Sequence, residues 1–175
     1  MNRKTLIAIA AASWAASAAG GWANDPDYSL ELHPTPCKAA TARIVAATGG
    51  VGTANDLAGP SLSFYEVAGE PPIEFLIDCG TSPETISAYT SLGLNDDQAH
   101  WITVAARIAY GLTGDHLSDA AAAVEKCLES TRQAAQDVRV TGYADLPKTH
   151  FECWTVHLEE GLTAGVTINP RAAKR

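Results

Sequence analysis

The chain of 175 residues carries 20 acidic against 12 basic residues, a formal net charge of −8 with neutral histidines. A chain this acidic repels phosphate backbones and anionic lipid surfaces, which argues against nucleic acid as a partner. Its length suits one domain with a substantial core and is short for two.

The first 23 residues have the three parts of a secretory signal peptide. Arg3 and Lys4 form a basic start, residues 6–19 form an apolar run, and small residues at 21–23 offer a cleavage site. The apolar run is short for a membrane span, and no later stretch approaches about 20 apolar residues. We therefore predict a signal peptide at 1–23 and a single exported domain at 24–175, periplasmic or secreted and not inserted in a membrane. This mature chain would keep 10 basic and all 20 acidic residues, a charge of about −10.

The first half of this domain shows a helix, a hairpin and a second, shorter helix. Thr35-Pro36 is an N-cap followed by proline and predicts a helix over 36–48, stopped by a glycine-rich loop that runs to residue 60. Alternating apolar residues predict strands at 62–67 and 73–78, joined by a hairpin loop. Ser82-Pro83 repeats the cap-and-proline signature and predicts a short helix that ends near Gly93.

The second half shows two longer helices and then strands. Asn95 and Gln98 have the spacing of a capping-box variant, and the apolar stripe behind them predicts a helix that ends by Gly114. Asp115 is placed to cap a second helix, which should run to about residue 136. Strands are predicted at 138–141, 150–158 and 162–168. The predicted fold class is α+β, an antiparallel sheet of about five strands with three or four helices packed on one face.

Four cysteines lie in the predicted mature chain, and an even count in an exported protein predicts two disulfides. Cys127 borders the apolar face of a helix, and Cys153 lies in the middle of a strand. A helix packed on a sheet would bring these two together, and Cys37 would then pair with Cys79. A Cys79–Cys153 or Cys37–Cys127 link would mean that the helix packs on another part of the sheet.

The search for catalytic motifs is largely negative. The sequence lacks the G-x-S-x-G, H-E-x-x-H and S-x-x-K motifs and a P-loop. No cofactor or metal is predicted. Trp101 and Trp154 are interpreted as core residues. Six weak candidates for a functional role remain: Asp78, Asp96, Asp97, His100, Asp115 and His116.

The candidates fall into three groups, each with a structural alternative. Asp96 and Asp97 precede His100 by four and three residues, so one helical turn would gather all three as an acid–base or metal set. The alternative is that these aspartates stabilise a helix N-terminus and that the histidine is an ordinary surface residue. Asp115 and His116 allow the same two interpretations. Asp78 would either cap the turn after its strand or line a pocket at the end of the sheet.

Two classes of function are compatible with these patterns. We favour a non-enzymatic exported protein, a small binding, inhibitor or accessory module that binds either a protein, such as another envelope or secreted protein, or a small ligand. The alternative is a small periplasmic hydrolase that uses a His/Asp arrangement gathered from distant positions. A pocket that gathers two or more of the candidate residues would favour the enzyme.

Overall fold

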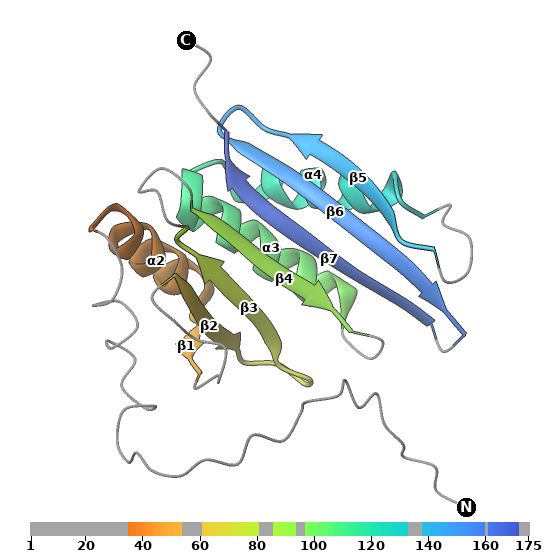
Figure 1. Ribbon diagram of the computed structural model, residues 1–175, viewed down its shortest axis with the longest axis horizontal. Coiled ribbons are helices and arrows are strands. Elements are labelled where there is room, and N and C mark those ends of the chain that lie inside the picture. The colour runs from red at the N-terminus through yellow and green to blue at the C-terminus, as the bar shows by residue number, and fades with distance from the viewer. Residues whose placement is uncertain are drawn as a thin grey trace, which may run out of the picture.

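The computed structural model describes residues 35–53, 61–80, 86–93, 97–132, 138–159 and 161–171. These residues form one antiparallel sheet of seven strands, with three helices on one of its faces (Figure 1). The predicted α+β class is therefore confirmed, although the sheet has seven strands where about five were expected. The predicted signal peptide, 1–23, lies outside the described residues.

The elements follow one another in two groups of strands with helices before and between them. In chain order they are α2 (Thr35–Thr48), β1 (Val51–Gly52), β2 (Leu62–Val67), β3 (Ile73–Asp78), β4 (Ser87–Leu92), α3 (Gln98–Thr113), α4 (Leu117–Glu129), β5 (Val140–Asp145), β6 (Thr149–Leu158) and β7 (Gly161–Pro170).

The sheet is built from two meanders that meet in the middle. Its strand order is β1-β2-β3-β4-β7-β6-β5, so the last strand of the first meander pairs with the last strand of the second. α3 and α4 connect the two meanders behind the sheet (Figure 1). One face of the sheet packs on the helices, and the other, which faces the viewer in Figure 1, carries none of the helices that the described residues form. We call this second face the open face.

The alternation of buried and exposed residues along each strand follows this division of the sheet into two faces. In β2 and β3, Tyr65, Phe75 and Ile77 are buried under the helices, while the residues between them are partly or fully exposed. The structure gives both strands the bounds that the sequence predicts. α3 buries the predicted apolar stripe, with Trp101 and Ile108 fully inaccessible to solvent. None of the helices in the described residues is long and apolar enough to cross a membrane.

The helix predicted from Ser82 to Gly93 is wrong over the described part of that segment. Residues 87–92 form β4, in which Ala88, Thr90 and Leu92 are buried and the intervening side chains lie on the open face. This strand pairs with β3 on one side and β7 on the other, so hydrogen bonding to two neighbours outweighs the local signature of a helix.

Smaller differences concern the ends of elements. Residues 51–52, expected to be loop, form β1 at the edge beside β2. α3 is capped by Asp97, and Asn95 lies outside the described residues. α4 ends at Glu129, earlier than predicted, and β5 continues to Asp145 because all six of its residues pair with β6.

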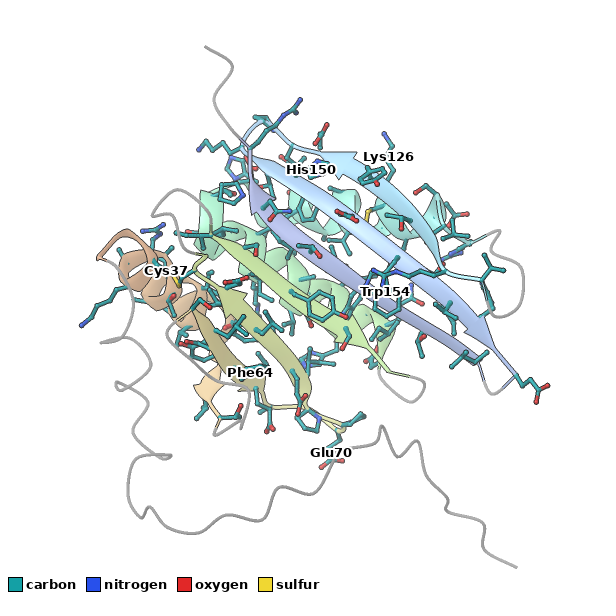
Figure 2. The ribbon with its side chains drawn as sticks, viewed as in Figure 1. Cys37, Phe64, Glu70, Lys126, His150 and Trp154 are labelled. Carbon is teal, nitrogen blue, oxygen red and sulfur yellow. A yellow bond between two sulfur atoms is a disulfide. The ribbon has the colours of Figure 1, made fainter. Side chains whose placement is uncertain are left out.

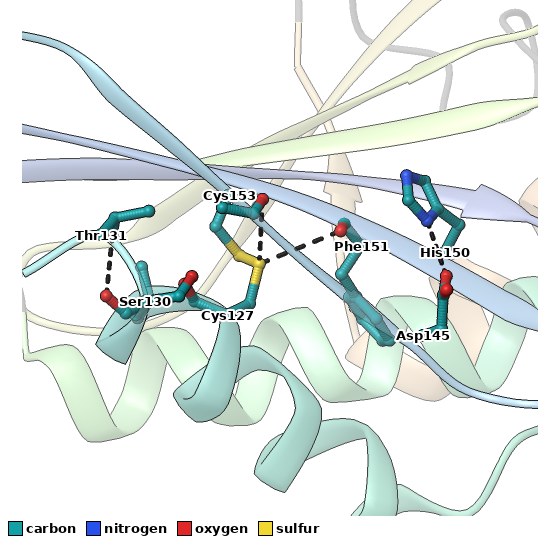
Figure 3. The surroundings of a disulfide bond; sticks show 9 residues. Cys127, Ser130, Thr131, Asp145, His150, Phe151 and Cys153 are labelled. Carbon is teal, nitrogen blue, oxygen red and sulfur yellow. Dashed lines mark hydrogen bonds and ion pairs between the residues drawn. A yellow bond between two sulfur atoms is a disulfide. The ribbon is translucent and has the colours of Figure 1, made fainter.

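Two disulfides join the helix layer to the sheet, one in each meander. Cys37 of α2 is bonded to Cys79, which follows β3 (Figure 2), and Cys127 of α4 is bonded to Cys153 of β6 (Figure 3). The Cα atoms of each pair are 5.8 Å apart, and all four residues are buried. Both predicted pairings are confirmed.

Candidate functional site

Two of the six candidates lie at the start of α3, where Asp97 is the N-cap and His100 is in the first turn. The Asp97 carboxylate accepts hydrogen bonds from the backbone N–H groups of Ala99 (2.9 Å) and His100 (3.4 Å), which is the geometry of an N-cap. The His100 ring packs against the β2–β3 loop, where a Cβ added to Gly69 would lie 3.0 Å from Nε2. That nitrogen is buried and has no hydrogen-bond partner among the described residues. The interpretation of His100 as an ordinary surface residue is therefore wrong. Asp96 lies outside the described residues.

Asp115 is not the cap of α4, because its carboxylate is buried in a network that reaches the β5–β6 connection. It accepts hydrogen bonds from the Thr149 hydroxyl (2.6 Å) and the Lys148 backbone N–H (3.3 Å). The Thr149 hydroxyl is also 2.6 Å from the hydroxyl of Thr113 at the end of α3. The cap position of α4 belongs to His116, which is exposed and makes no side-chain cap hydrogen bond. Asp115 is thus a structural residue that joins the α3–α4 junction to the sheet.

Asp78 ends β3 and caps the turn that follows. Its Oδ1 accepts a hydrogen bond from the backbone N–H of Gly80 at 2.8 Å, which confirms the first of its two predicted roles. His100 lies in the first turn of the 16-residue α3, which is about 24 Å long, and His116 lies beyond the other end of this helix. The structure therefore does not gather these histidines into one catalytic or metal site. The described residues contain no group of three or more side chains suited to hold a metal.

The open face presents a different set of residues, which the sequence did not indicate. Three side chains follow one another across β2, β3 and β4, because Phe64 is paired with Leu76 and Leu76 with Tyr89. In the adjacent row, Glu66 is paired directly with Glu74. Figure 2 shows the side chains of this face, with Phe64 labelled.

These two rows surround a pocket in the sheet surface with a volume of about 320 Å³. This volume lies at the lower end of the range for small-molecule sites, so the pocket suits one side chain or a small group. None of the six candidates lines it. Its lining residues are Thr53, Phe64, Tyr65, Glu66, Glu74, Phe75, Leu76, Tyr89 and Ser91.

An aromatic cluster borders the pocket toward β7 and β6. The indole of Trp154 lies over Gly165 of the neighbouring strand, and the Arg139 guanidinium carbon is 4.7 Å from the ring centroid. Burial raises the pKa of Tyr89, and the charge of Arg139 and hydrogen bonds with Ser91 and Trp154 offset part of the rise. Trp154 is only partly buried and lies on the open face (Figure 2), so its interpretation as a core residue is wrong. The same interpretation of Trp101, which is fully buried, is confirmed.

A histidine–aspartate pair stands farther along the open face. His150 Nδ1 is 2.7 Å from Asp145 Oδ1, and the two residues are direct cross-strand neighbours in β6 and β5 (Figure 3). Arg171 approaches the other carboxylate oxygen at 3.7 Å, and the Tyr143 ring stacks on the imidazole. Both members of the pair are more than a third exposed. Sequence reasoning missed it because β5 was predicted to end before Asp145.

Comparisons with protein-family models, with curated proteins and with solved structures found no match for this chain.

Proposed function

We propose that this protein is an exported binding module that uses the open face of its sheet to bind another envelope or secreted protein. One observation carries the proposal: the open face presents a pocket between Phe64 and Tyr89, beside the Trp154 cluster, while the helices cover the other face. Tyrosine and tryptophan offer large contact areas at low conformational cost and are enriched where proteins bind each other. The two disulfides support export, since such bonds persist in oxidising compartments.

Site-specific photo-crosslinking in the native envelope tests this proposal. A benzophenone amino acid at Thr167, on the open face of central strand β7, should give a discrete crosslinked product. The same amino acid at Tyr110, which is 49% exposed on α3, is the matched control and should give none. Equal yields of one product from both positions would contradict a role for the open face.

Export is tested separately. The intact mass of the native chain should correspond to a start at or near Asn24, after cleavage of the predicted signal peptide. A cytoplasmic chain that retains Met1 would contradict the proposed location.

The His150–Asp145 pair is the observation that favours the alternative, a small hydrolase. A carboxylate bonded to Nδ1 orients an imidazole so that Nε2 is available as a general base. A panel of ester, amide and phosphoester substrates should then show turnover that His150→Gln lowers by about 100-fold. Turnover that is absent, or unaffected by this substitution, would leave binding as the better account.

A further inference from the structure

The pocket on the open face has charged walls as well as aromatic ones. Glu66 and Glu74 are direct cross-strand partners, and both line the pocket. Thr53 closes one side, because its backbone N–H donates to the Phe64 carbonyl (2.9 Å) and continues the pairing of β1 with β2. Directly opposed residues in an antiparallel pair have Cβ atoms about 5 Å apart, so both carboxylates are able to reach one bound group.

Within the described residues, neither carboxylate is matched by a positive charge. Neither Glu66 nor Glu74 takes part in an ion pair or a side-chain hydrogen bond with another described residue. Arg139, the arginine of the neighbouring cluster, is stacked on Trp154. Like charges placed directly opposite each other in a sheet repel. A cation bound between the two carboxylates would attract both of them and offset this repulsion.

We propose that this pocket binds the guanidinium group of an arginine side chain that the protein partner supplies; this inference rests on the proposed function. A guanidinium is planar and has five N–H donors, so it can hydrogen-bond to both carboxylates while its face stacks on an aromatic ring. Phe64 and Tyr89 supply such rings in the same pocket. A lysine ammonium satisfies the charge but cannot stack and is more strongly hydrated, so it should bind less well.

Backbone-amide NMR of the purified protein, titrated with blocked glycine-X-glycine tripeptides, tests this inference. X is arginine, lysine or citrulline, the last being a neutral analogue of arginine with nearly the same shape. The arginine peptide should shift the amide signals of residues 64–66, 74–76 and 89–91. It should bind about threefold more tightly than the lysine peptide and about tenfold more tightly than the citrulline peptide.

Variants identify the groups responsible. The double substitution Glu66→Gln with Glu74→Gln should weaken binding of the arginine peptide about tenfold, because the charge is removed and the side-chain shape is kept. Glu152→Gln, on the same face of β6 but outside the pocket, is the matched control and should change the affinity by less than about twofold. Circular dichroism and amide spectra confirm that each variant is folded.

The outcomes separate this inference from the proposed function. Equal binding of the arginine and citrulline peptides, or unchanged affinity in the double variant, would overturn the guanidinium site. If Thr167 still crosslinks to a partner in that case, the open face remains a binding surface and only the chemistry of the pocket is wrong. If the crosslink is lost in the double Glu66/Glu74 variant but kept in Glu152→Gln, both the site and its place in the interface are supported.

Discussion

Gly165 makes the arrangement of the open face testable by a single methyl group. The indole of Trp154 lies so close over this residue that an added Cβ would fall about 2.6 Å from two of its ring atoms, far inside van der Waals contact. Gly165 has no positive φ, so alanine suits the backbone at this position. Any loss of stability in Gly165→Ala must then come from the displaced indole.

The magnitude follows from two opposing effects. Forcing a side chain out of a packed position costs about 1–3 kcal/mol. Replacing glycine by alanine at a compatible site returns about 0.4–1 kcal/mol, because the unfolded chain loses conformational freedom. We therefore expect Gly165→Ala to lower the free energy of unfolding by about 1–2 kcal/mol.

A double-mutant cycle measured by urea unfolding decides the cause. In a Trp154→Ala background the indole is absent, so Gly165→Ala should become neutral or stabilise by up to about 1 kcal/mol. The coupling between the two positions should thus be about 1–3 kcal/mol. An equal loss in both backgrounds would refute the contact, because the cost would then lie in the backbone of β7.

Three further predictions concern the rest of the fold. Asp115→Asn should lower the free energy of unfolding by about 1–3 kcal/mol in urea titrations, because its buried hydrogen bonds lose their charged acceptor; His116→Ala, its exposed neighbour, should change it by less than about 0.5 kcal/mol. Replacing both Cys127 and Cys153 by alanine should remove about 3.5 kcal/mol for a loop with a sequence separation of 26, and a non-reducing peptide map of the native chain should show this link. Because burial raises the pKa of Tyr89 above 10.0, the unfolded chain ionises first. Stability should therefore fall as the pH rises through the raised pKa, and Tyr89→Phe should flatten that fall in urea titrations at alkaline pH.

The parts of the fold that could be predicted are those with a strong local pattern. Residues 73–78 alternate between apolar and polar side chains except at Leu76, and residues 62–67 include Phe64, Tyr65 and Val67, which favour strands, so both strands have the predicted bounds. The Cys127–Cys153 pairing required only a helix with one apolar face and a strand with a known inward side. In each case the decisive information lies within a few neighbouring residues.

β4 could not be predicted for the opposite reason. Its sequence is rich in small and hydroxyl residues, follows a Ser-Pro helix signature, and becomes a strand because β3 and β7 pair with it on both sides. The pocket was missed with it, since Tyr89 and Ser91 reach the pocket only from this strand. The alternation of Ala88, Thr90 and Leu92 with more polar residues was the one signal that favoured a strand.

The Glu66–Glu74 pair is a local conflict that the fold itself does not require. Directly opposed like charges in a sheet destabilise it by an amount comparable to the 0.2–1 kcal/mol typical of a favourable pair, about a tenth of a small domain's stability. A glutamine at either position would keep the strand pairing and remove the repulsion. Departures of this kind from local consistency are expected at functional sites, where a ligand supplies the missing interaction. The pair lies in a pocket with aromatic walls on the open face, which none of the described helices covers, and this is where an incoming arginine would resolve the conflict.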